Sequence, residues 1–137
     1  KRRELAHRYS EHLAPQGVVV PVERDWGKHV YHLYIIRSKR RDELQAFLQK
    51  KGVGTEVYYP VPMHLQECFA YLGHTTGAFP ESERAAKETL ALPIFPELTE
   101  SQARYVVECI REFFDQTAPA LAAAQSKQRG STFLSLR

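Results

Sequence analysis

The sequence predicts an α+β domain in which three or four short strands form a small mixed or antiparallel sheet with helices packed on it. Short runs of β-branched and aromatic residues alternate with segments of helical periodicity. With 137 residues and an apolar share of 43%, the chain suits a single domain with its own core. The expected strands are 18–22, 30–36, 55–59 and 92–95.

The first expected element is a helix over residues 1–14. Its apolar residues recur every fourth position and would form one buried stripe: Leu5, Tyr9 and Leu13. Pro15-Gln16-Gly17 then breaks the helix. The next segment, 18–22, is β-branched but contains Pro21, which cannot donate to a sheet, so we expect an edge strand.

Residues 30–36 predict a central strand that is covered on both sides. Alternation would place Tyr31, Leu33 and Ile35 on one face and His32, Tyr34 and Ile36 on the other. His29 and His32 would then face opposite ways and could not chelate one metal ion together. His32 has two interpretations, a hydrogen-bonded core histidine or a side chain that points into a site.

The middle of the chain continues with a helix that Ser38 can cap and that Gly52 ends. Its apolar face carries Leu44, Phe47 and Leu48. After the strand at 55–59, a short helix over 65–72 is expected, with Cys68 as a small buried apolar group.

In the C-terminal part, Pro80 can begin a helix. Thr99 and Gln102 have the spacing of a capping box. The helix behind them has the clearest periodicity in the chain, with apolar residues Ala103, Val106, Val107, Ile110, Phe113 and Phe114. Segment 117–137 lacks such a pattern, and we expect a frayed helix or a disordered tail.

A rigid loop follows the third expected strand: Tyr58-Tyr59-Pro60-Val61-Pro62-Met63-His64. The two prolines hold Tyr59 and Val61 in extended conformations. Two phenols and one imidazole are therefore presented along a stiff path, as a binding site requires. The alternative is a simple strand-to-helix connector whose tyrosines pack in the core.

Composition narrows the possible functions. The net charge of +3 and the scattered basic residues do not form the continuous stripe of a nucleic-acid binder. Cys68 and Cys109 are far apart, which argues against a disulfide-built fold or a zinc site and suits a reducing cytoplasm. No apolar run approaches the roughly 18 residues of a membrane span. Phosphate-loop, nucleophile-elbow and zinc-protease motifs are absent from the sequence.

Several motifs occur in series from about Arg3 to Phe114. They are HVYHLYIIR at 29–37, GVGT at 52–55, YPVPMHLQ at 59–66, FP with SE at 79–83, and LALPIFPELT at 90–99. In order and spacing they resemble the C-terminal part of the DegT/DnrJ/EryC1/StrS family, the pyridoxal-phosphate-dependent sugar aminotransferases.

This resemblance implies a division of the chain. Residues 17–116 correspond to the family's C-terminal small domain, and residues 1–16 to the helix that links it to a large N-terminal domain. In the family, that large domain holds the cofactor phosphate and the lysine that forms the Schiff base. We therefore expect a fragment, a split-gene product or a degenerate relative, and a chain that is inactive alone.

For the complete enzyme, the resemblance implies transfer of an amino group, typically from glutamate, to a keto group of a nucleotide-linked sugar. Pyridoxal phosphate is the implied cofactor, and a homodimer is expected. One alternative is a non-catalytic interaction or regulatory module that keeps the fold. Another, a nucleic-acid-binding domain, rests only on the basic N-terminus.

The motif match also implies substrate-binding residues. His64 and Tyr59 would each bind a sugar hydroxyl or a substrate phosphate, and His32 is a third candidate. No residue of this chain is expected to be catalytic, to hold the cofactor or to bind a metal ion. Ala91 stands where many family members have Ser, so a hydroxyl group is missing there.

Overall fold

The computed structural model describes residues 1–131, with side chains for residues 1–116. Within this part, four α-helices and two strands confirm the α+β class. The helices are α1 (Arg2–Leu13), α2 (Arg41–Lys50), α3 (Pro80–Glu88) and α4 (Glu100–Ser131), and the strands are β1 (Tyr34–Arg37) and β2 (Thr89–Leu92). Short 3₁₀ turns occur at Ala14–Gln16, Met63–Leu65 and Glu67–Leu72.

The sheet is small and antiparallel. Strands β1 and β2 pair directly, with Tyr34 opposite Leu92 and Ile36 opposite Leu90. Single bridges add one segment on each side, Val19 to Arg37 of β1 and Glu56 to Ala91 of β2. The expected strands at 18–22 and 55–59 therefore lie where a sheet would place them, but each contributes one bridge rather than a ladder.

The prediction of a covered strand over 30–36 is wrong in its first half. Tyr31 has φ +48°, so the chain leaves the extended conformation before the strand begins. Tyr31 is consequently buried on the same side as Tyr34, with ring centroids 6.1 Å apart, instead of facing the other way. Strand β2 also differs from the prediction: it begins at Thr89 instead of residue 92, and Pro93 follows its end.

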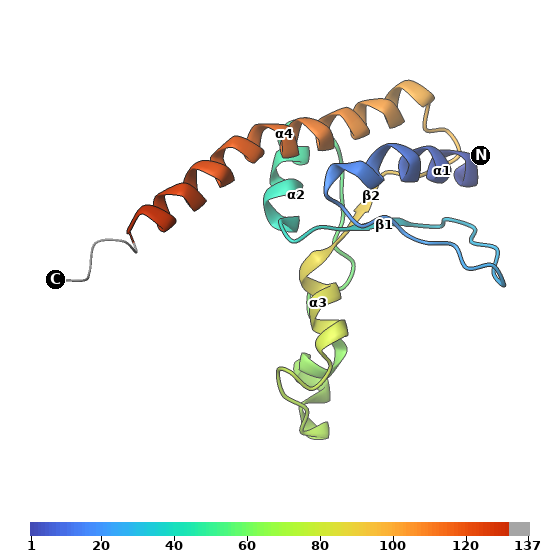
Figure 1. Ribbon diagram of the computed structural model, residues 1–137. Coiled ribbons are helices and arrows are strands. Elements are labelled where there is room, and N and C mark those ends of the chain that lie inside the picture. Colours follow the sequence, from blue (N-terminus) through green and yellow to red (C-terminus); the bar gives the residue numbers. More distant parts are fainter. Residues whose placement is uncertain (132–137) are drawn as a thin grey trace.

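Helices α1, α2 and α4 share one buried core with a single face of the sheet (Figure 1). Tyr34 and Ile36 of β1 and Leu90 of β2 point into it and are fully buried. The expected stripe of α1 is confirmed, since Leu5, Tyr9 and Leu13 are all buried. The other face of the sheet, with Ile35 half-buried and Ala91, lies outside this cluster.

Helix α4 is the largest contributor to the core. All but one of its expected apolar residues are buried, and Phe114 is half-buried. The capping box is confirmed: the Gln102 N–H donates to Thr99 Oγ1 at 3.3 Å, and the Thr99 N–H donates to Gln102 Oε1 at 2.9 Å. The helix continues to Ser131, whereas residues 132–137 of the expected tail lie outside the described part of the chain.

Residues 58–88 form an arm that extends away from the core, and α3 leads from the far part of the arm back to β2 (Figure 1). Of its described residues, none belongs to the main apolar cluster. The expected helix at 65–72 consists of 3₁₀ turns, and Gly73 ends them with φ +71°. Cys68 is exposed there, so the prediction that it is buried is wrong, while Cys109 is buried in α4. Within the described residues, no helix is long and apolar enough to cross a membrane.

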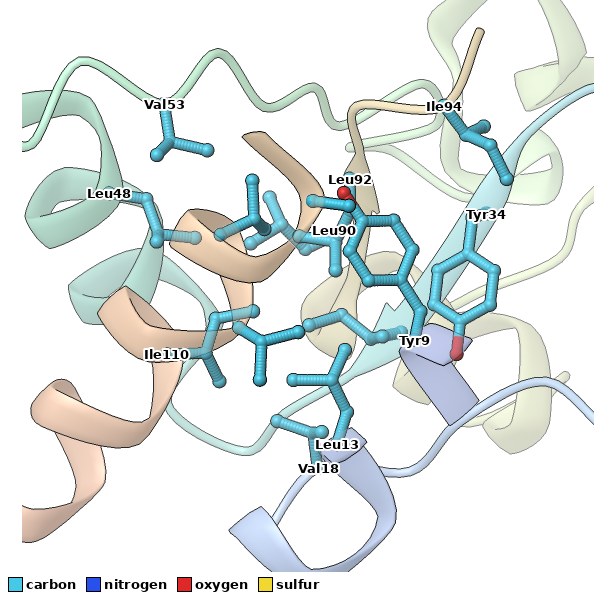
Figure 2. Packing of buried hydrophobic residues seen from close by; sticks show 14 of the residues in the cluster. Tyr9, Leu13, Val18, Tyr34, Leu48, Val53, Leu90, Leu92, Ile94 and Ile110 are labelled. Carbon is cyan, nitrogen blue, oxygen red and sulfur yellow. The ribbon is translucent and has the colours of Figure 1, made fainter. Parts of the chain in front are cut away.

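Two buried tyrosines should make the stability of the fold depend on pH in the alkaline range. The rings of Tyr9 and Tyr34 lie side by side in the core, with centroids 5.1 Å apart (Figure 2). Burial raises the pKa of Tyr34 to about 12 and also raises the pKa of Tyr9. In the unfolded chain, the pKa of tyrosine is about 10. Above that pH the unfolded chain binds fewer protons than the folded chain, so the free energy of unfolding should fall.

Replacement of Tyr34 by Phe removes one of these groups. The free energy of unfolding of Tyr34→Phe should therefore decline less steeply between about pH 10 and about pH 12 than that of the wild type. Urea denaturation across this range measures the slope. Tyr71→Phe is the matched control, because the Tyr71 side chain is exposed and its loss should leave the slope unchanged. Equal slopes in Tyr34→Phe and wild type would contradict the expectation.

Candidate functional site

The double-proline loop leaves the sheet beside β2 and enters the 3₁₀ turn at Met63–Leu65. Tyr58 is 50% exposed and Tyr59 is 72% exposed. The alternative in which both tyrosines pack in the core is therefore wrong. The loop presents its phenols at the surface, as a binding loop would.

An open hollow lies between this loop and α3. Its floor includes Ile35 and Ala91, from the sheet face that the core does not cover. Tyr58, Tyr59 and Met63 line it from the loop. Its polar groups come from three other places: Glu56 beside β2, Ser82 on α3 and Thr89 at the start of β2. Apolar walls with a few polar groups are typical of ligand pockets.

A second hollow adjoins the first. Glu56 and Tyr58 line both, so these two side chains lie on the boundary between them. His32 lines the second hollow and is exposed. The interpretation of His32 as a core histidine is therefore wrong, and its side chain lies at the surface in a hollow that Tyr58 also lines.

His64 lies in a different environment from Tyr59 and His32. Its Nε2 is 3.1 Å from Glu83 Oε1, and the two side chains are 8% and 10% exposed. The Gly77 N–H donates to the same carboxylate oxygen at 2.7 Å. The ring of Phe79 meets the His64 imidazole edge-on, with centroids 4.9 Å apart. His64 therefore packs inside the arm and is not among the residues that line the two hollows.

Electrostatics of this pair follow from its hydrogen bonds. The Gly77 N–H, and after it the His64 imidazole, hold the pKa of Glu83 below its usual value, against the opposing effect of burial. Glu83 is therefore a carboxylate at neutral pH and accepts from both neighbours. One buried carboxylate thus joins the 3₁₀ turn of His64, the loop at Gly77 and helix α3.

The structure brings two of the three expected site residues to neighbouring hollows and separates the third from them. Tyr59 and His32 line adjoining hollows that share Tyr58, whereas His64 lies within the arm. Sequence reasoning missed Glu83 as the partner of His64. The Ser82-Glu83 motif was visible, but a pairing across nineteen residues of irregular chain leaves no periodic signal.

The lysines of this part of the chain, residues 1–116, lie outside the two hollows. Lys51 donates to Glu112 at 2.7 Å, which raises the pKa of the Lys51 ammonium and favours its charged form. A Schiff-base lysine needs the opposite shift. Among the same residues, no cluster of three or more His, Cys, Asp or Glu side chains is placed to hold a metal ion.

Comparison with known proteins identifies the family to which this chain is similar. The model of the DegT/DnrJ/EryC1/StrS aminotransferase family matches residues 1–111. A "pleiotropic regulatory protein" of Geobacillus stearothermophilus is 53% identical over 117 residues, which are 83% of this chain and 32% of that protein. The dTDP-3-amino-3,4,6-trideoxy-alpha-D-glucose transaminase of Streptomyces venezuelae is 36% identical over 121 residues, which are 88% of this chain and 32% of that enzyme.

Solved structures show the same fold. S. venezuelae DesV, in complex with a ketimine intermediate, superposes with a TM-score of 0.80 at 37% identity, over 83% of this chain and 31% of DesV. An aminotransferase from Brucella abortus gives a TM-score of 0.76 at 34% identity, over 82% of this chain and 30% of its own. The chain spans about a third of the length of the curated relatives it matches.

Proposed function

The chain belongs to the DegT/DnrJ/EryC1/StrS aminotransferase family, and on this basis we propose that it is the C-terminal part of an enzyme that transfers an amino group to a keto sugar nucleotide. The observation that carries the proposal is the family match over residues 1–111 together with the superposition on DesV. Relatives named as transaminases of dTDP-linked amino sugars support a nucleotide-linked sugar as the substrate. The amino donor is proposed to be glutamate.

The cofactor of the complete enzyme is proposed to be pyridoxal phosphate. A related structure, Bacillus subtilis NtdA, carries bound pyridoxamine phosphate. Since none of the lysines in residues 1–116 lines either hollow, we place the cofactor lysine in the part of the complete protein that this chain does not include. When bound there, the cofactor serves as the electron sink of amino transfer. Residues 1–116 would be inactive alone, and α1 would connect them to that part.

The role of this chain is to bind and orient the sugar. The Tyr59 hydroxyl is exposed at one hollow and can donate to or accept from a sugar hydroxyl. His32 is placed to do the same from the adjoining hollow. His64 would contribute through Nδ1, because its Nε2 is paired with Glu83. We propose that the complete enzyme is a homodimer.

Substitutions in the complete enzyme test these roles. Tyr59→Phe and His32→Ala should each raise the KM for the sugar nucleotide about 2- to 10-fold, the loss of one hydrogen bond, and leave the KM for the amino donor unchanged. His64→Ala should raise it at least as much. Tyr71→Phe is the control, since this exposed phenol lies on the 3₁₀ turn Glu67–Leu72, away from both hollows. An unchanged KM for the sugar nucleotide in all three variants would refute a binding role.

A second candidate is a regulatory or interaction module that keeps the fold without catalysis. One specific observation favours it, the name of the Geobacillus relative, which describes a pleiotropic regulatory protein. The visible absorbance of the purified complete protein distinguishes the two candidates. An aminotransferase with bound pyridoxal phosphate absorbs visible light when the complete protein is purified, whereas a regulatory module would not.

A further inference from the structure

Glu56 brings the only carboxylate of residues 1–116 to the walls of the two hollows, and it lines both of them. No lysine or arginine of the same residues lines either hollow. The Glu56 side chain is exposed and forms no ion pair with a described residue. The walls of both hollows therefore share one negative charge that no neighbouring ammonium or guanidinium group balances.

The backbone of Glu56 is fixed to the floor of the first hollow. Its N–H donates to the Ala91 carbonyl at 3.2 Å, and the Ala91 N–H donates to the Glu56 carbonyl at 2.9 Å. The Val57 N–H donates to Glu56 Oε1 at 3.1 Å, whereas Oε2 accepts from none of the described residues. A carboxylate oxygen on a rigid element is thus available to a ligand at the boundary between the hollows.

The chemistry of these walls limits what can bind there. The hydroxyls of Tyr58, Tyr59 and Thr89 can donate or accept, but a carboxylate only accepts. A ligand group beside Glu56 must therefore donate, as the hydroxyls of a sugar do. A phosphate or a carboxylate of the ligand would only accept and would carry the same sign of charge as Glu56.

We propose that Glu56 is a further substrate-binding and specificity-determining residue, which accepts hydroxyls of the sugar and selects neutral sugars over sugars that carry a carboxylate. This inference rests on the proposed function, in which the hollows bind the sugar. By the same argument, the diphosphate of the nucleotide lies outside the two hollows, because their walls offer it no lysine or arginine.

Two matched ligands test this selection by calorimetry on the complete protein. They are dTDP-glucose and dTDP-glucuronic acid, which share the nucleotide and differ by one carboxylate; the nucleotide follows the relatives named as dTDP-sugar transaminases. The wild type should prefer dTDP-glucose about 2- to 5-fold through repulsion at an exposed site, and added salt should reduce that preference. Glu56→Gln should bind dTDP-glucose about 2- to 10-fold more weakly and lose the preference.

The control variant is Glu108→Gln, which removes an exposed carboxylate of α4 that lines neither hollow and should change neither affinity. A preference that persists in Glu56→Gln, or an equal weakening of dTDP without a sugar, would overturn the inference. If Tyr59→Phe weakens dTDP-glucose binding while Glu56→Gln does not, the inference fails and the proposed function stands. A wild type that binds neither sugar nucleotide would refute the proposed function, and the inference with it.

Discussion

The chain alone should not retain pyridoxal phosphate, and it should show no amino transfer above the rate of the free cofactor. A protein in which the same chain follows a large domain with a Schiff-base lysine should be coloured and active. The physical reason lies in the lysines of residues 1–116, which do not line the hollows, and in Lys51, which its ion pair with Glu112 keeps charged. Enzymes typically accelerate their reactions by about 10⁶-fold or more. The isolated chain should therefore show no measurable amino transfer beside the complete protein.

The measurement is an absorbance spectrum after incubation with pyridoxal phosphate and removal of the free cofactor. Borohydride reduction then traps any Schiff base on its lysine. Random, substoichiometric labelling of several exposed lysines is the expected background in the isolated chain. Stoichiometric trapping on a single lysine of this chain would contradict the proposed division of labour.

Truncation of Ile110, in the middle of the buried face of α4, should cause a large loss of stability. Ile110 is fully buried in the apolar cluster that α4 shares with α1 and α2 (Figure 2). Ile110→Ala removes buried methyl groups and leaves a cavity, which costs about 2–5 kcal/mol. That is a large share of the roughly 5–15 kcal/mol that stabilises a typical domain.

Urea denaturation measures this loss as a shift of the midpoint at constant slope. Val22→Ala is the matched control, since Val22 is 77% exposed and its truncation should change stability by less than about 0.5 kcal/mol. Similar shifts in both variants would mean that α4 does not pack on the core as the structure shows.

Much of the fold could be predicted because its helices are amphipathic. The stripes of α1 and α4 and the capping box at Thr99 depend on local spacing, which the sequence displays directly. The strands were harder to predict. The left-handed Tyr31 interrupts the alternation before β1, and no local residue pattern signals a positive φ at a tyrosine.

The site was predictable in part. Two prolines in a short span indicated a stiff surface loop, and the exposure of Tyr59 agrees with that. The pairing of His64 with Glu83 was not predictable, because it joins a 3₁₀ turn to a helix across an irregular loop. Likewise, the exposure of Cys68 follows from the arm's separation from the core, which composition does not show.

The most direct test of the central claim is to read the coding sequence immediately upstream of the codon for Lys1. We expect an open reading frame in phase with this chain that encodes a large domain with a Schiff-base lysine, as a sugar aminotransferase requires. A stop codon or an unrelated gene at that position would contradict the account and would favour a module that works through a partner.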